Sequence, residues 1–294
     1  MTRNLLFVFF ALICLNLSAQ ETQDTSYWKK GGMASLSFSQ TSLSNWSGGG
    51  DNAISTNVQL NLFANYTKAK NAWDNTLKLE YGLLKQGDAG TRKSIDKIDF
   101  VTKYGHQASK KWYYTALLDF KTQFAKGYNY GKNEGDIDQK VSNFLAPAYL
   151  LLSLGMDYKP NETFSAYLSP ITGKITIVND DYLSGLGAFG VDPGDKIRYE
   201  FGALTKFTLK KSIAKNVDLK STLDLFTAYS DSFGNIDVNW DLMINMKVNE
   251  FLTASINTTL VYDDDVEYVN KDGINKGVKV QFKEILGIGL SYKF

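Results

Sequence analysis

Hydrophobic and polar residues alternate along most of this chain. Between residues 54 and 66, Ile54, Val58 and Leu60 share one parity, whereas Asn57 and Gln59 lie on the other. A period of two places successive side chains on opposite faces of an extended strand. The pattern therefore predicts about twelve strands, each with one apolar and one polar face, at residues 33–40, 54–66, 73–85, 95–104, 112–124, 146–158, 163–178, 197–209, 217–229, 236–248, 252–262 and 278–294.

The predicted connections alternate in length. Short ones fall at residues 67–71, 106–110, 159–162, 211–215 and 249–250, and generally longer ones at 41–52, 86–93, 127–145, 179–195, 231–235 and 264–276. An even number of antiparallel strands, with short turns at one rim and longer loops at the other, is typical of bacterial outer-membrane barrels.

Alternation alone does not say which face lies inside. A soluble sandwich or lipocalin-like barrel packs its apolar face inward, whereas a membrane barrel turns that face to lipid. Many predicted strands run about 13–17 residues, and strands of soluble proteins are usually about 5–6 residues long. The last predicted strand also ends on an aromatic residue, Phe294. We therefore predict an all-β, antiparallel, up-and-down transmembrane β-barrel of about twelve strands.

The aromatic content supports the membrane interpretation. The chain has 17 Tyr, 18 Phe and 5 Trp among 294 residues, and many of these rings lie near strand ends on the apolar parity. Rings with an apolar body and a polar tip gather at the two interfaces of a bilayer. The overall charge is nearly balanced, with 32 basic and 31 acidic residues, which argues against nucleic-acid binding.

The first residues have the features of an export signal. Arg3 precedes an apolar run from Leu5 to Leu15, and the small residue Ala19 stands just before Gln20. We expect a cleaved signal peptide at 1–19, a short periplasmic segment at 20–32 and the barrel at 33–294, in the outer membrane of a Gram-negative cell. The single cysteine, Cys14, lies in the expected signal. Thiolate chemistry is therefore not expected, and no cofactor or metal is assigned.

The polar parity carries charges of both signs. Opposite charges on neighbouring strands can pair, which gives a wall of satisfied ion pairs. The alternative is a permeation path with an ion-selective constriction, which needs one sign to dominate at one level, and the sequence shows no such excess. The candidate residues facing the barrel interior are Lys78, Glu80, Asp99, Lys103, Asp119, Lys121, Arg198, Glu200, Asp224 and Asp241.

Signals for catalysis or metal binding are weak. His106 is the only histidine and falls at a predicted short turn, where we expect it to be solvated. The acidic run at 263–267, followed by Asp272 and Gly273, matches only the start of a calcium loop. We interpret it as a solvated acidic loop and expect the protein not to be an enzyme.

Three segments carry a family resemblance. Trp28-Lys-Lys-Gly-Gly runs into the segment 38–50, and 168–174 and 190–194 form two further matches. Together they resemble an uncharacterised family of Bacteroidota envelope proteins, known only as a domain of unknown function. The resemblance implies an outer-membrane location and supplies no activity, ligand or catalytic residue.

Two functions remain open at this stage. The first is a narrow pore for small solutes, and the second is a structural or assembly component that binds other envelope proteins through its loops. Trp46, an aromatic residue among Ser, Asn and Gly, is the candidate loop contact. The expected partners are outer-membrane lipids and the barrel-insertion machinery, which would read the strand that ends at Phe294.

Overall fold

A computed structural model describes residues 26–43, 51–130, 138–230, 233–269 and 275–294. Twelve antiparallel strands form one closed barrel, in the order β1-β16-β13-β12-β11-β10-β9-β8-β5-β4-β3-β2. The strands of the barrel are β1 (Trp28–Thr41), β2 (Ala53–Lys68), β3 (Asn71–Gln86), β4 (Arg92–Gln107), β5 (Trp112–Thr122), β8 (Ala148–Tyr158), β9 (Phe164–Ile177), β10 (Ile197–Ala214), β11 (Val217–Ala228), β12 (Asp237–Lys247), β13 (Leu252–Tyr262) and β16 (Gln281–Lys293).

The longer connections contain structure of their own. Two small hairpins pair β6 (Gly127–Asn129) with β7 (Gln139–Ser142), and β14 (Glu267–Val269) with β15 (Asn275–Val278). The short helices α2 (Asp181–Gly185) and η1 (Ala188–Gly190) lie between β9 and β10. Among the described residues, no helix is long and apolar enough to cross a membrane. We call the rim with these connections the long-loop end, and the opposite rim the short-turn end.

All twelve predicted strands are present, and the two largest differences lie at the start of β1 and the end of β10. β1 begins at Trp28 rather than at residue 33, because Trp28 already pairs with Tyr66 of β2. β10 continues to Ala214, so the short connection predicted at 211–215 is wrong, and the turn consists of residues 215–216. The expected signal peptide and Trp46 lie outside the described residues.

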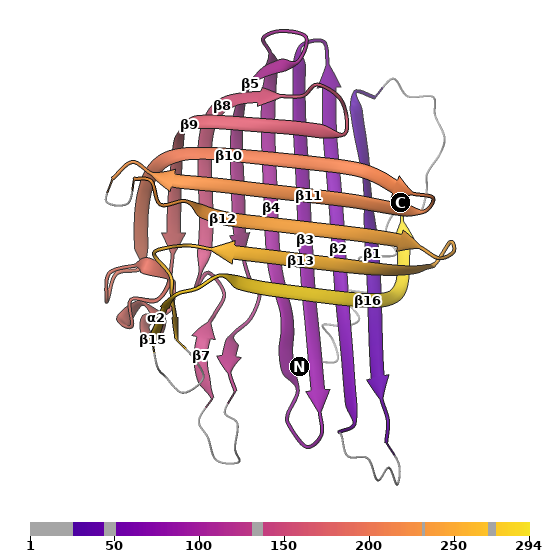
Figure 1. Cartoon of the computed structure of the whole chain (residues 1–294), viewed down its shortest axis with the longest axis vertical. Coiled ribbons are helices and arrows are strands. Elements are labelled where there is room, and N and C mark those ends of the chain that lie inside the picture. The colour runs from indigo at the N-terminus through magenta and orange to yellow at the C-terminus, as the bar shows by residue number, and fades with distance from the viewer. Residues whose placement is uncertain (1–25, 44–50, 131–137, 231–232, 270–274) are drawn as a thin grey trace.

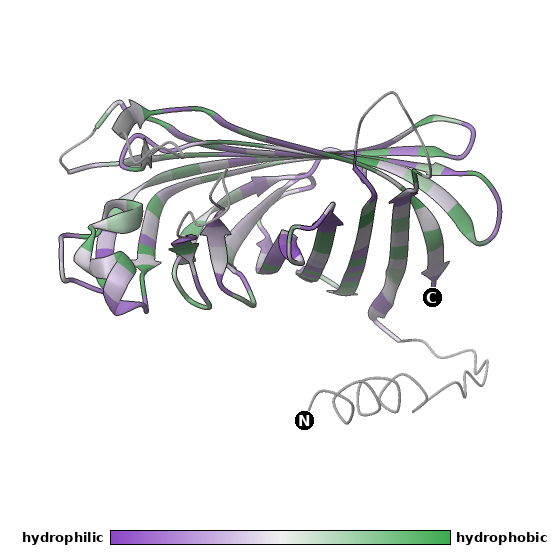
Figure 2. Cartoon of the chain, turned by 90° about the horizontal axis from the view of Figure 1, so that it is seen from below, coloured by the Kyte–Doolittle hydropathy of each residue, from purple (hydrophilic) through white to green (hydrophobic). Residues whose placement is uncertain are grey.

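The distribution of side chains in the barrel is the reverse of that in a soluble protein, with apolar side chains outside and charged ones inside. Strands β1–β5 form one wall, and β10–β13 with β16 cross in front of it (Figure 1). Apolar side chains are outermost: Leu152 is 46% exposed, Leu154 57% and Leu286 69%. Inward-facing Asp119 and Asp157 are only 1% exposed. Figure 2 shows the resulting bands of hydrophobic and hydrophilic residues along each strand. The outer surface therefore matches lipid rather than water.

Aromatic rings from neighbouring strands touch at both ends of the barrel. At the short-turn end, the ring of Trp28 lies 5.2 Å from that of Tyr66 and 5.7 Å from that of Trp73. At the long-loop end, Phe201 and Tyr229 are 5.6 Å apart. These contacts form the two girdles that the sequence predicts, with the spacing of favourable ring pairs.

Part of the interior is filled by apolar side chains. A buried cluster combines Leu117 of β5, Tyr167 of β9, Leu204 of β10, and Phe226 and Ala228 of β11. Leu117 and Phe226 lie on the polar parity of their strands, so sequence parity already placed them inside. This cluster joins facing walls and narrows one side of the interior, which we call the lumen.

The ladder that closes the barrel is short. Residue pairs between β1 and β16 run from Met33 opposite Lys293 to Ser37 opposite Gly289. Within the described part of the chain, the rest of β1 beyond Ser37 pairs with β2 alone, and residues 281–288 of β16 pair with β13 alone. The other neighbouring strands are paired along far more of their length. We call this incompletely paired junction the seam.

The segment between β9 and β10 folds into a packed cap at the long-loop end. Leu183 and Val191 bury their side chains against Ala146 and Val178. Asp180 caps α2 by accepting hydrogen bonds from the backbone N–H groups of Tyr182 and Leu183. Its carboxylate also accepts hydrogen bonds from Lys140 Nζ of β7, at 2.7 Å, and from Asn143 Nδ2, at 2.9 Å. One carboxylate thus joins the cap to the β6–β7 hairpin region.

Protonation of the Asp180 carboxylate should loosen this cap. Burial alone would raise the pKa of this carboxyl, but hydrogen bonds from Lys140 and Asn143 outweigh it and hold the pKa at about 2. A lowered pKa stabilises the folded cap above about pH 4, the ordinary aspartate pKa, and this stabilisation is lost as the pH falls toward 2. We expect Asp180→Asn to make the cap as sensitive to protease at pH 7 as the wild-type cap is near pH 2.

Limited proteolysis with pepsin at low pH and trypsin at neutral pH measures this effect. Asp181→Asn is the matched control, because Asp181 is highly exposed and forms an ion pair with Lys196 at the surface. Equal protection of all three proteins across the pH range would contradict the assigned role of Asp180.

Candidate functional site in the barrel lumen

The lumen is crossed at mid-height by an alternating network of two aspartates and two lysines. Lys206 Nζ lies 3.1 Å from Asp119 and 2.8 Å from Asp224. Lys121 Nζ lies 3.6 Å from Asp119 and 3.4 Å from Asp224. Asp119 and Lys121 are inward residues of β5, whereas Lys206 and Asp224 lie opposite each other on β10 and β11. The four charges tie two facing walls together.

A second bridge runs beside this network. Lys97 of β4 pairs with Asp99 on its own strand, at 3.3 Å, and with Asp241 of β12, at 3.2 Å. Asp241 also accepts a hydrogen bond from Thr259 Oγ1. Lys78 of β3 approaches Asp99 at 3.8 Å. Lys97 and Asp241 come from opposite walls, so their pair spans the lumen.

The long-loop end of the lumen is more acidic. Lys174 Nζ of β9 lies 2.6 Å from Asp237, 3.3 Å from Glu200 and 3.4 Å from Asp263. Arg198 of β10 pairs with Asp265 at 2.7 Å and donates to the carbonyl oxygen of Gly190 in the cap. These contacts attach both the cap and the loop after β13 to the barrel wall.

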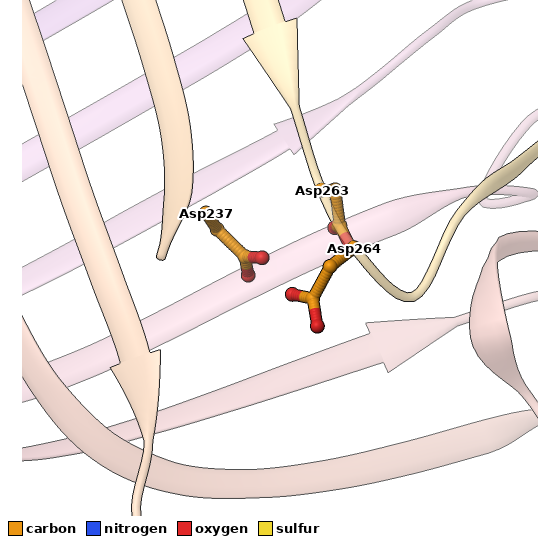
Figure 3. A group of neighbouring side chains, drawn as sticks. All are labelled: Asp237, Asp263 and Asp264. Atoms are coloured by element: carbon orange, nitrogen blue, oxygen red, sulfur yellow. The ribbon is translucent and has the colours of Figure 1, made fainter. Parts of the chain in front are cut away.

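Asp237, Asp263 and Asp264 form a close acidic group at this end. One carboxylate oxygen from each lies within 4.8 Å of the others, and Figure 3 shows the three side chains converging from the start of β12 and the end of β13. Lys174 already supplies positive charge to Asp237 and Asp263. The predicted solvated loop is therefore held partly in an ion-pair network, and we assign no cation to it.

The short-turn end has its own network. Lys103 of β4 lies 2.6 Å from Asp157 of β8, and Lys159 lies 2.8 Å from Asp74 and 3.5 Å from Asp157. Burial by itself lowers the pKa of Lys159, but the carboxylates of Asp74 and Asp157 outweigh it and raise the pKa above its usual value. Lys159 therefore stays charged and joins β3 to the turn after β8.

A cavity of about 1310 Å³ extends from the short-turn end to the mid-height network. Ten lysines and eight acidic residues line it, so positive charge is in slight excess. A second cavity, of about 30 Å³, shares Lys78, Lys220 and Asp241 with the first and reaches Lys283 of β16. The open space thus continues along residues of β11, β12 and β13.

The ten candidate residues occupy three levels of the lumen. Lys78, Asp99, Lys103, Asp119, Lys121, Asp224 and Asp241 line the large cavity, Glu80 lines the small one, and Arg198 and Glu200 lie at the long-loop end. The sequence list omitted Lys174 and Asp157, both of which pair with several partners. The polar parity of Thr172, Lys174 and Thr176 was the available signal for Lys174. It was obscured because Pro170 interrupts β9, where the ladders shift register on both sides.

His106 is the second-to-last residue of β4 rather than part of a turn. Its Nδ1 lies 2.8 Å from Asn71 Oδ1, and the ring is exposed. No carboxylate or nucleophile contacts it among the described residues.

A closed antiparallel barrel with an apolar outer face and a charged interior defines a transmembrane β-barrel of the outer-membrane type. The profile of a family described as "Protein of unknown function (DUF3078)" matches residues 38–128. A comparison with curated protein sequences found no match.

Several solved barrels are similar in overall form. The translocator domain of the autotransporter NalP from Neisseria meningitidis has 9% identity and a TM-score of 0.40, over 100% of this chain and 96% of that one. The NanC porin has 7% identity and a TM-score of 0.39, over 88% and 98% of the two chains. An outer membrane channel from Pseudomonas putida F1 has 13% identity and a TM-score of 0.38, over 95% and 98%.

Proposed function

We propose that this protein is a non-enzymatic, narrow pore for small solutes in the outer membrane of a Gram-negative cell. The observation that carries the proposal is the cavity of about 1310 Å³, which is open at the short-turn end and lined by charged side chains. A barrel of twelve strands is intermediate between small packed barrels and open porins of 16–18 strands. Charged, hydrated walls lower the cost of moving polar solutes through a low-dielectric membrane.

The proposed path runs past the Lys97–Asp241 pair. The two cavities meet beside it, and the apolar cluster occupies the other side of the lumen. Because the pair spans facing walls at 3.2 Å, solutes must pass next to it or displace it. We infer that this ion pair sets the size of the opening.

Conductance in planar bilayers tests the pore. Purified wild-type protein should give small, reproducible single-channel steps, and Lys97→Ser/Asp241→Ser should raise the unit conductance because two long side chains leave the constriction together. Lys159→Ser/Asp74→Ser is the matched control, since it removes an ion pair at the wide mouth and should leave the conductance nearly unchanged. If none of the three proteins gives single-channel conductance, the proposed pore function is overturned.

The apolar cluster of Leu117, Tyr167, Leu204 and Phe226 favours a second candidate, a structural or assembly component of the envelope. Side chains that join the walls in this way stiffen a barrel and obstruct its interior. A barrel that is silent in bilayers and co-purifies with defined envelope proteins would support this role. The loop around Trp46 is the proposed contact, and the strand ending at Phe294 is the proposed signal for the insertion machinery.

The resemblance to Bacteroidota envelope proteins supports a Bacteroidota source as part of this proposal. Cleavage of residues 1–19 on export belongs to the same proposal, and N-terminal sequencing of the membrane-inserted protein tests it.

A further inference from the structure

Two inward-facing lysines lie directly opposite each other near the short-turn end. Lys210 of β10 pairs in register with Lys220 of β11, and both line the large cavity. Side chains in such positions have Cβ atoms about 5 Å apart, and like charges placed there repel. The charged positions around this pair are different: Ser212 lies opposite Asp218, and two inward positions deeper Lys206 lies between Asp119 and Asp224.

Neither lysine is neutralised within the described part of the chain. Lys103, Lys121 and Lys206 each form an ion pair within 4 Å, whereas Lys210 and Lys220 form none among the described residues. The nearest acidic side chain on β11, Asp218, accepts a hydrogen bond from Ser212 Oγ at 2.5 Å. On the neighbouring strand β12, the residue opposite Lys220 is Met243, whose thioether carries no charge. The two ammonium groups are thus an uncompensated pair in a lumen of otherwise paired charges.

Further donors surround the pair. Thr208 and Thr222 lie opposite each other, one inward position further into the barrel, and both line the same cavity. Lys78 of β3 shares both cavities with Lys220, and its only ion pair among the described residues is the long one to Asp99, at 3.8 Å. Three ammonium groups and two hydroxyl groups therefore face one water-accessible space.

We propose that Lys210, Lys220 and Lys78, with the hydroxyl groups of Thr208 and Thr222, bind the anionic group of a small solute, a carboxylate, sulfate or phosphate. An anion between Lys210 and Lys220 turns their repulsion into two charge-assisted hydrogen bonds, and ammonium groups bind such anions as point charges. The cavity is above the 300–1,000 Å³ that is usual for small-molecule sites, so the rest of the solute fits in it. This inference rests on the proposed pore and gives that pore a preference for anions.

Two measurements on the purified, full barrel test the site. The first is titration of the detergent-solubilised protein with inorganic phosphate at low ionic strength, where screening is weak. Wild type should bind, and Lys220→Gln and Lys210→Gln should each weaken binding roughly tenfold, as expected for the loss of one charge-assisted hydrogen bond. The second is the reversal potential in a KCl gradient, which should move toward cation selectivity in both variants.

Lys211→Gln is the matched control. Lys211 follows Lys210 on the same strand, so its side chain lies on the opposite face. The substitution Lys211→Gln removes the same charge at the same height outside the lumen, and phosphate affinity and selectivity should therefore stay at wild-type values. Lys220→Arg keeps the charge and should retain most of the affinity. Both glutamine variants remove a repulsion, so they should be at least as resistant to heat as wild type, which shows that they are folded.

The outcomes separate the site from the pore. The anion site is overturned, even if the barrel conducts, when wild type binds no phosphate. It is also overturned when Lys210→Gln, Lys220→Gln and Lys211→Gln all have the same phosphate affinity. Lysine-dependent phosphate binding by a barrel that is silent in bilayers supports the site and overturns the pore. Conductance with a selectivity that none of the variants changes supports the pore and overturns the site.

Discussion

Leu152→Lys is expected to destabilise the barrel in lipid vesicles by about 2–4 kcal/mol, the cost of a lysine on the lipid face at the middle of a bilayer. Leu152 lies at the middle of β8 and is 46% exposed. In water, a lysine at so exposed a position would cost almost nothing. The substitution therefore measures which solvent the outer surface meets. Denaturant unfolding in vesicles, followed by tryptophan fluorescence, gives the free energy of unfolding.

Ile213→Lys provides the comparison for Leu152→Lys. Ile213 is similarly exposed, at 49%, but lies near the short-turn end of β10. Close to the interface, the same substitution should cost only about 0–1 kcal/mol. Equal and small losses at both positions would mean that the apolar face is not in contact with acyl chains. The location and the pore would then fail together.

Asp119→Ala is expected to lower the free energy of unfolding by about 3–5 kcal/mol, because it leaves one of the buried positive charges of Lys121 and Lys206 uncompensated. Asp119 is 1% exposed and lies 3.1 Å from Lys206 and 3.6 Å from Lys121. Its loss leaves two positive charges around the single carboxylate of Asp224. The same unfolding measurement in vesicles, together with gel mobility of heated and unheated samples, detects the change.

Asp119→Ala/Lys206→Ala tests whether charge or packing causes that loss. The double variant keeps one balanced pair, Lys121 with Asp224 at 3.4 Å. It should therefore be more stable than the sum of the two single changes predicts, with a coupling of about 0.5–3 kcal/mol. Simple additivity would show that the four charges act independently and that the mid-height network does not hold the walls together.

Much of the wall could be predicted from the sequence because a strand has a fixed period. Parity alone separated Leu118 from Asp119, and it placed Leu117 and Phe226 inside although they are apolar. Aromatic residues at strand ends, such as Trp112 and Tyr158 at the short-turn end, then indicated the interface there. The two rings are 4.8 Å apart in the structure. These features depend only on residues that are close in sequence or on neighbouring strands.

The partners across the lumen could not be predicted in the same way. Lys97 and Asp241 are 144 residues apart, and their meeting depends on how the closed sheet is tilted and staggered. The Lys210–Lys220 pair was missed for a local reason. The predicted strand ends at residue 209 and is followed by a short connection at 211–215, whereas β10 continues to Ala214 and Asn216 adopts the positive φ that the tighter turn requires. A strand end misplaced by five residues hid the inward positions of Lys210 and Ser212.

The seam determines where the barrel opens most easily. Hydrogen bonds hold β1 to β16 only between Met33 and Ser37 and at Gly32 with Phe294, so the two strands can part there with fewer bonds broken than at any fully paired junction. Acyl chains offer neither donors nor acceptors to the free edges at 38–41 and 281–288. We therefore expect thermal opening of the barrel to be concentrated at the junction between β1 and β16. On unfolding, these first and last strands of the barrel should separate before the other strands do.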